Sequence, residues 1–262
     1  MSTLVIHGVL SLCIREISLQ FVQQVRYSTL LCFLKNVIKI MVVHHKRQSS
    51  TLKLTQTINI IITIPYHIIS SYIELGKAAE LKPQFSSRNV KLCGFSCNDA
   101  DSHKGWIEDI KVATGQNVTF PLFCDPDRSI STELGILDET NKNAAGLPMT
   151  VRSVFILKPD RTVALLLTYP ASCGRNFDEI LRVVDSLQLT CTHSVATPVN
   201  WKKGSDVIVN FPLTDVDADE AFGKGGYKVV DLPSEKDKDL PKHYLRYTKD
   251  PLADSTDCCI IQ

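Results

Sequence analysis

Near residue 70 the sequence becomes a regular alternation of helix patterns and strand patterns, and this alternation limits the possible folds more than any other feature. Amphipathic stretches with apolar residues three or four positions apart are separated by short apolar runs of strand length. The turn sequence KPDR joins two of these runs as in a β-hairpin. The predicted elements are, in order, a helix at 74–89, a strand at 90–97, a helix at 98–115, a strand at 120–123, a helix at 125–136, hairpin strands at 150–157 and 162–169, and a helix at 176–190. This order predicts the α/β class, with a mixed sheet and helices packed against it.

Local signals indicate where the predicted helices begin and end. The helix at 98–115 has Asn98 or Asp99 as its N-cap and Gly115 as its terminator. Pro83 is expected to bend the end of the helix at 74–89. The helix at 176–190 carries its apolar residues on one face, namely Phe177, Ile180, Leu181, Val184 and Leu187.

Residues 1–70 differ in composition from the rest of the chain. They hold seven Lys or Arg and a single acid, Glu16, whereas residues 71–262 hold 22 basic and 27 acidic residues. One glycine and one proline leave the segment almost without turn signals. Lys35 and Lys39 interrupt its longest apolar stretch, so we predict no membrane span. A basic, acid-poor start is also found in transit peptides, but arginine is not dominant here and no regular apolar helix face is sustained.

From Cys191 the sequence changes to loops that are rich in proline, glycine and charge. We predict a small module at 191–250 that wraps over a partner surface, followed by a tail at 251–262. Short apolar anchors are spaced along the module: Trp201, Val207 to Val209, Phe222 and Tyr244 to Tyr247.

Nine cysteines are scattered along the chain, and no pair has the two-residue gap of a zinc knuckle or a dithiol redox motif. The odd number and the lack of a convincing secretory signal predict reduced thiols in a cytoplasmic protein. Cys93 and Cys97 lie in a strand pattern, where a free cysteine packs as a small hydrophobic residue. We expect neither a metal nor an organic cofactor. Basic residues are not clustered with aromatic ones, so we expect no nucleic-acid partner.

Five segments of the regular region carry distinctive motifs. They are NVKLCGFSCNDADSHKGWIEDI, FPLFCDPDRSISTELGILD, GLPMTVRSVFILKPDRTV, YPASCGRNFDEILRVVDSLQLT and VATPVNWKKGSDVIV. In this order and spacing they closely resemble the one-cysteine peroxiredoxins of type six, from about Glu74 to Thr248. The resemblance implies a thioredoxin-like fold for 71–190 and a C-terminal dimerisation module for 191–250. It also implies thiol-dependent reduction of hydrogen peroxide and of organic or lipid hydroperoxides, with an outside thiol such as glutathione as reductant.

The resemblance places the reactive residue of the family at the start of the first long helix. There the family has a Pro-x-x-x-Thr-x-x-Cys motif, whose thiolate attacks the peroxide O–O bond. Aligning on the sequence ELG at 74–76 puts Ser71 at the cysteine, Ile69 at the proline and Ile68 at the threonine of the family sequence TPVC. A serine hydroxyl is not ionised near pH 7 and has no sulfenic acid state, so we predict that this chain is inactive as a peroxidase.

Arg152, in PMTVRSVF, matches the arginine that approaches the reactive sulfur in the family. The alternative for Arg152 is an arginine that is salt-bridged at a strand end. Arg128 is predicted to cap or pair locally. Some relatives are credited with a phospholipase triad, of which only the aspartate counterpart, Asp160, is present; as it lies in the KPDR turn, we interpret it as a turn residue.

Two interpretations of residues 1–70 follow from the resemblance. One is that the segment is not native peroxiredoxin sequence but an alternative first exon or translated non-coding sequence, which leaves the sheet incomplete at its N-terminus and the fold marginal. The other is a functional extension that replaces the missing strands, for which INIIITIP at 58–65 is a strand candidate.

The expected partners differ between a working enzyme and an inactive form. A working enzyme meets a hydroperoxide and a thiol reductant and forms a homodimer, whereas an inactive form pairs with an intact peroxiredoxin subunit. The chain ends in CCIIQ, which fits a prenylation box at Cys259 with Cys258 as a second lipid acceptor. The protein would meet a membrane only if this tail is lipidated; the alternative is an acidic tail that ends apolar by chance.

Overall fold

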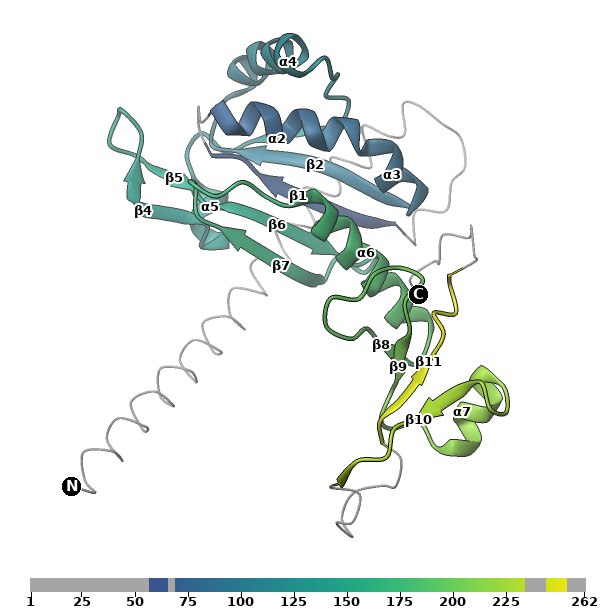
Figure 1. Cartoon of the computed structure of the whole chain (residues 1–262). Coiled ribbons are helices and arrows are strands. Elements are labelled where there is room, and N and C mark those ends of the chain that lie inside the picture. The colour runs from purple at the N-terminus through teal and green to yellow at the C-terminus, as the bar shows by residue number, and fades with distance from the viewer. Residues whose placement is uncertain (1–56, 66–68, 234–243, 254–262) are drawn as a thin grey trace, which may run out of the picture.

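The computed structural model describes residues 57–65, 69–233 and 244–253. In these residues a five-stranded sheet lies between helices, and a smaller four-stranded sheet follows at the C-terminal end (Figure 1). The described part contains no helix that is both long and apolar enough to cross a membrane. The mixed α/β class predicted from the sequence is confirmed.

The central strand of the large sheet comes from the segment before residue 70. It pairs in parallel with its neighbour on one side, with Ile58 opposite Val90, and antiparallel on the other, with Asn59 opposite Leu157. The order across the sheet is β3 (Leu122–Cys124), β2 (Val90–Ser96), β1 (Ile58–Thr63), β6 (Arg152–Leu157) and β7 (Val163–Tyr169).

The expectation that the sheet lacks a strand because of residues 1–70 is therefore wrong for residues 58–63. The sheet is not open at this position, because the strand candidate INIIITIP fills its centre. Ile60 and Ile62 face one layer of helices, while Ile61 faces the other side of the sheet. A strand that is buried on both faces needs apolar residues at successive positions, which explains the run of isoleucines.

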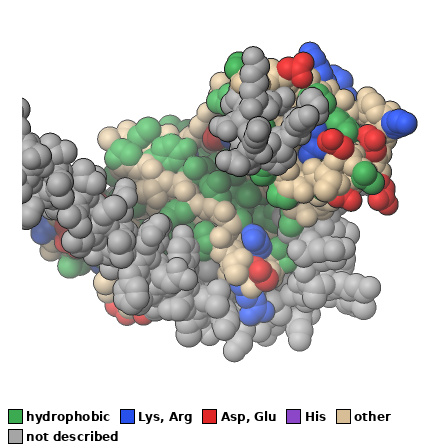
Figure 2. Space-filling view, turned by 90° about the horizontal axis from the view of Figure 1, so that it is seen from below, with side chains coloured by type: hydrophobic (Ala, Val, Ile, Leu, Met, Phe, Trp, Pro, Cys, Tyr) green, Lys and Arg blue, Asp and Glu red, His purple; other side chains and the backbone are tan. Residues whose placement is uncertain are grey.

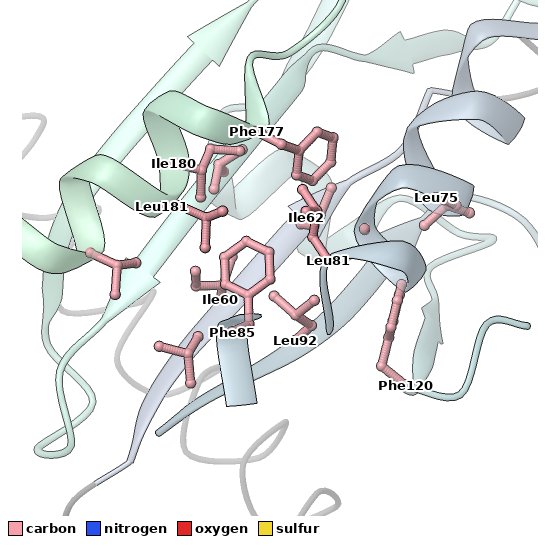
Figure 3. Close-up of a cluster of buried hydrophobic side chains, with 14 of the residues drawn as sticks. Ile60, Ile62, Leu75, Leu81, Phe85, Leu92, Phe120, Phe177, Ile180 and Leu181 are labelled. Atoms are coloured by element: carbon pink, nitrogen blue, oxygen red, sulfur yellow. The ribbon is translucent and has the colours of Figure 1, made fainter. Parts of the chain in front are cut away.

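Four helices cover one face of the sheet. Their apolar side chains meet those of β1, β2 and β6 in the larger core, which is drawn in Figure 3 with Ile60, Phe85 and Ile180 among the labelled residues. The helices are α2 (Ile69–Glu80), α3 (Lys82–Ser87), α4 (Ala100–Thr114) and α6 (Phe177–Thr192). The predicted helix at 74–89 is thus two helices, with the break at Leu81 and Pro83 in the first turn of α3.

The opposite face carries a smaller core. Ile61, Phe95 and Phe155 project from the sheet and pack with Ile130 and Leu134 of a short helix. The elements on this side are α5 (Ser129–Leu134) and the two-stranded pair β4 (Leu137–Lys142) and β5 (Pro148–Thr150).

The ends of α4 follow the predicted signals. Asp99 is the N-cap, since its Oδ1 accepts a hydrogen bond from the Ser102 backbone N at 2.8 Å. Gly115 ends the helix with a left-handed φ of 72°. The hairpin of β6 and β7 is also confirmed, whereas the strand predicted at 120–123 runs instead from Leu122 to Cys124, because Phe120 turns into the larger core.

The C-terminal module is built on a second sheet. Trp201 and Val207, two of the predicted anchors, are buried together with Val195 and with Leu189 of α6, so the module is continuous with the last helix of the large domain. Its elements are β8 (Val195–Ala196), β9 (Val207–Val209), α7 (Asp215–Phe222), β10 (Tyr227–Val229) and β11 (Arg246–Thr248), and the sheet order is β10-β11-β9-β8.

Candidate active site

Ser71 lies in the first turn of α2, just beyond the end of the central strand β1. Its side chain is buried, and its Oγ donates a hydrogen bond to the Pro65 carbonyl oxygen at 3.3 Å. The backbone N–H groups of a helix start and the helix dipole favour negative charge at this place. The position therefore suits an anionic side chain, whereas the serine hydroxyl that occupies it is neutral.

Glu74, one helical turn after Ser71, is also buried and holds two arginines. Its Oε2 accepts hydrogen bonds from Arg152 Nη1 at 2.5 Å and from Arg175 Nη2 at 2.8 Å. Its Oε1 accepts a third hydrogen bond, from the Arg175 backbone N at 2.8 Å. One carboxylate thus anchors both guanidinium groups next to the start of α2.

Both arginines make further hydrogen bonds to backbone carbonyls. Arg152, the first residue of β6, donates from Nε to the Ala171 carbonyl at 2.8 Å. Arg175 donates from Nη1 to the Thr63 carbonyl at 2.7 Å and to the Ser153 carbonyl at 3.1 Å. These bonds connect the ends of β1 and β6 with α2 and with the loop before α6, and they keep both charges at defined places.

The electrostatic balance of this cluster is positive. Burial raises the pKa of Glu74, but the charges and hydrogen bonds of Arg175, together with the charge of Arg152, outweigh it and lower the pKa below its usual value of 4.5. The carboxylate is therefore ionised at neutral pH, and two arginines face one acid. The two guanidinium groups and the N-terminal turn of α2 lie in the same buried region, and together they favour an anion there.

The sequence pattern pointed to two members of this site and missed two. Ser71 and Arg152 are brought to the same end of the sheet, as the alignment on Glu74 implied. Glu74 served there only as an alignment point, and Arg175 was overlooked. The only local signal for Arg175 is its place directly before Asn176, the N-cap of α6.

Two other residues singled out from the sequence have local roles. Arg128 donates to the carbonyl oxygens of Pro126 at 3.1 Å and Pro148 at 3.0 Å, so the predicted local pairing is confirmed. Asp160 accepts hydrogen bonds from the Thr162 backbone N at 2.9 Å and its Oγ1 at 2.7 Å, which is the geometry of a turn residue.

The other positions named from the sequence lie in a helix, in or next to a strand, or outside the described residues. Ile69 begins α2, while Ile68, Cys258 and Cys259 lie outside the described residues. Cys93 and Cys97 are buried in and just after β2, as small core residues should be.

Comparison with known protein families gives two matches. Residues 48–166 match the AhpC/TSA family, and residues 186–225 match the C-terminal domain of 1-Cys peroxiredoxin. The first match starts ahead of β1, in agreement with the position of that strand in the sheet.

Individual relatives support the same assignment. The chain is 47% identical over 182 residues to Peroxiredoxin-6 of Rattus norvegicus, covering 68% of this chain and 78% of the relative. It is 44% identical over 187 residues to 1-Cys peroxiredoxin of Onchocerca volvulus, with the same two coverages.

Among solved structures, a cysteine-to-serine mutant of Peroxiredoxin 6 from Arenicola marina superimposes with a TM-score of 0.70 and 37% identity, covering 76% of this chain and 88% of that one. A yeast mitochondrial 1-Cys peroxiredoxin gives a TM-score of 0.64 with 36% identity, covering 75% and 88%. The fold is therefore thioredoxin-like with a C-terminal peroxiredoxin domain, and the chain belongs to the AhpC/TSA family, among the one-cysteine peroxiredoxins.

Proposed function

We propose that this chain keeps the charged framework of a peroxiredoxin active site without its nucleophile, and that it does not reduce hydroperoxides by itself. The observation that carries the proposal is Ser71, buried in the first turn of α2 with the ion-paired Glu74 one turn later. The reaction of the family is thiol-dependent reduction of hydroperoxides. A thiolate at this position would be stabilised by the helix start and by the arginines, whereas a serine hydroxyl stays protonated.

Among the described residues, neither of the first two cysteines that follow α2 in the chain, Cys93 and Cys97, can replace the missing thiol. The sequence has none between Cys32 and Cys93. Cys93 is fully buried in β2, and burial raises the pKa of its thiol far above neutral pH. The pKa of Cys97 is raised as well, chiefly by burial, so both are neutral thiols that a peroxide in solution cannot reach.

The framework gives the proposal a direct test. The purified full chain is incubated with hydrogen peroxide or cumene hydroperoxide and glutathione, and peroxide consumption is followed. We expect none above the rate without protein. In Ser71→Cys we expect one equivalent of peroxide to be consumed quickly and a sulfenic acid to be trapped by dimedone at position 71, because the arginine cluster stabilises the thiolate and the leaving oxygen.

Ser86→Cys is the matched control, since Ser86 is exposed on α3 and does not belong to the arginine cluster. Its new thiol should react at the slow rate of an ordinary cysteine. Robust glutathione-dependent turnover by the unaltered chain would overturn the proposal. Equal peroxide reactivity in Ser71→Cys and Ser86→Cys would show that the framework does not activate a nucleophile.

A second function is pairing with an intact peroxiredoxin subunit, or with a second copy of this chain. Among the described residues, β7 has a strand partner on one side only, so its other edge can pair with another chain. Leu166 on this strand is 43% exposed. Seen from below, hydrophobic side chains gather in a shallow hollow near the middle of the molecular surface (Figure 2).

Pairing is tested by mixing the chain with an intact one-cysteine peroxiredoxin and measuring mass by size-exclusion chromatography with light scattering. We expect a mixed dimer, which Leu166→Lys weakens at least tenfold. Val112→Lys on α4 is the control, because Val112 is 87% exposed and lies away from β7. A chain that stays monomeric at tens of micromolar, alone and beside the intact peroxiredoxin, would exclude this function. We propose in addition that glutathione reduces the active partner. We also propose that the protein is located in the cytoplasm.

A further inference from the structure

A second group of reactive side chains lies at the ends of β2 and β3. Cys124 Sγ is 3.4 Å from His103 Nδ1, and the other ring nitrogen, Nε2, is 2.6 Å from Ser96 Oγ. Cys124 is half-buried, whereas His103 and Ser96 are buried. Of these three side chains, the Cys124 thiol is therefore the one that solvent can reach.

The fold holds these three side chains firmly in place. Ser96 and Cys124 are direct neighbours in the parallel pairing of β2 and β3, and each is the last residue of its strand. α4 begins four residues after Ser96, and its fourth residue, His103, contacts both strand ends. The His103 ring stacks on Trp106 with 6.1 Å between ring centroids. The imidazole is therefore oriented by the Ser96 hydroxyl on one side and by an aromatic ring on its face.

We propose that Cys124 is a thiol–disulfide exchange site for low-molecular-weight disulfides, with His103 as the general base. The arrangement of a nucleophile, a base within hydrogen-bond reach and a third group that orients the base is the one used for nucleophile activation in general. This proposal concerns different residues from the cluster around Ser71. It can therefore be tested independently of the proposed function.

The protonation states suit a base-assisted reaction. Burial lowers the pKa of His103, with Asp99 opposing this effect, so the ring is neutral at pH 7 and can accept a proton. Burial, together with the charge of Asp99, raises the pKa of Cys124. A thiol in this state carries little thiolate of its own and depends on a neighbouring base, while its high basicity makes the thiolate, once formed, a strong nucleophile.

The exchange step balances without a further reactant. His103 takes the proton as the Cys124 sulfur attacks one sulfur of the disulfide, the disulfide bond breaks, and the proton passes to the departing thiolate. The products are a mixed disulfide on Cys124 and one free thiol.

In the described part of the chain, no second cysteine forms a hydrogen bond or a disulfide with Cys124. Cys97, the nearest in sequence to Ser96, contacts Ser131 of α5, which lies on the opposite face of the sheet from α4 (Figure 1). Modified Cys124 is therefore expected to persist until an external thiol removes the adduct.

The test uses the full chain and glutathione disulfide at pH 7, followed by quenching with an alkylating reagent, trypsin digestion and mass spectrometry. Cleavage after Lys111 and Arg128 yields a peptide with Cys124 as its single cysteine, and cleavage after Arg161 and Arg175 does the same for Cys173. Cys173 is exposed and serves as the internal reference. We expect Cys124 to be modified several-fold faster than Cys173 in the native chain, and the difference to disappear in denaturant.

His103→Gln removes the base and keeps a polar side chain. It should slow modification of Cys124 at least tenfold and leave the rate of Cys173 unchanged. A native chain in which Cys124 reacts no faster than Cys173 would overturn the proposal, and this comparison decides the matter even if the variant does not fold. Unchanged Cys124 reactivity in a folded His103→Gln variant would overturn it equally.

Discussion

Glu74 and Arg152 lie 78 positions apart in the chain and form a buried ion pair of 2.5 Å at the end of the central sheet. The same carboxylate oxygen also accepts a hydrogen bond from Arg175. Glu74 thus forms ion pairs with two buried cations, and α2, β6 and the start of α6 are held together through it.

Glu74→Gln should be strongly destabilising. The amide removes the charge that both buried guanidinium groups pair with, for which we expect a loss of about 3–5 kcal/mol in the free energy of unfolding. Urea unfolding followed by circular dichroism measures this loss. Glu80→Gln is the control, because Glu80 forms an exposed ion pair with Lys77. An equal loss in the free energy of unfolding in both variants would show that the buried ion pair contributes no more to stability than the exposed one.

The contribution of Glu74 should also depend on pH. Because its pKa in the folded chain lies below the usual 4.5, its stabilising effect is fully present above that pH and is lost as the pH falls through the lowered folded value. The difference in stability between wild type and Glu74→Gln should therefore be constant from about pH 6 to 8 and shrink in acid. A difference that grows on acidification would contradict this sign.

The central strand shows where the sequence was misleading. A family alignment that starts near residue 70 leaves INIIIT outside, and its three successive isoleucines lack the alternation that normally indicates a strand. The reason is burial on both faces, which only the completed sheet reveals. Helix ends such as Asp99 and Gly115 were predictable, in contrast, because their signals are local.

Ile60→Ala tests how much β1 contributes to the stability of the fold. Ile60 is fully buried between the sheet and its helices, so removing its side chain should cost about 2–5 kcal/mol. Ile73→Ala is a control with the same chemistry, because Ile73 is 62% exposed on α2 and should change stability by less than about 0.5 kcal/mol. Thermal and urea unfolding measure both. Equal behaviour of the two variants would mean that residues 58–63 are not part of the folded core.

The site was predictable in part for a similar reason. Ser71 and Arg152 were found through motifs, but Arg175 follows a glycine in a loop-like stretch and resembles a solvated charge. Its burial depends on Glu74 and on the carbonyls of Thr63 and Ser153, which are distant in sequence. No local pattern contains that information.

The cap of α4 permits a precise comparison of two aspartates. Asp99→Ala removes the side chain that accepts from the Ser102 backbone N and should cost about 1 kcal/mol. Asp101→Ala, two residues later, removes only an exposed ion pair with Lys104 and should leave the unfolding midpoint unchanged. Urea unfolding of the two variants side by side gives the answer, and a larger effect at Asp101 would refute the assignment of the cap.

Arg246 should stabilise the C-terminal module through buried polar contacts, as Glu74 does in the large domain. It is buried, donates to Asp215 Oδ1 at 2.8 Å and to the Leu213 carbonyl at 2.5 Å, and lies over the Tyr227 ring. Arg246→Ala leaves that carbonyl without its donor, and we expect a loss of about 2 kcal/mol. Arg246→Lys should recover only part of it, since lysine lacks the planar fork of donors.

Lys249→Ala is the control for Arg246, because the pair of Lys249 with Asp206 is exposed. Limited proteolysis of the module, compared with unfolding of the whole chain, measures the effect. Resistance that is equal in Arg246→Ala and Lys249→Ala would show that Arg246 does not hold the module together.

The central position of β1 has a consequence for synthesis on the ribosome. β1 is made first, yet its antiparallel partner β6 begins only at Arg152, so at about 5–20 residues per second the strand waits on the order of ten seconds for that neighbour. During this interval INIIIT offers at least one unpaired, β-branched edge to other chains. The nascent protein thus depends on being shielded until the second half of its sheet emerges.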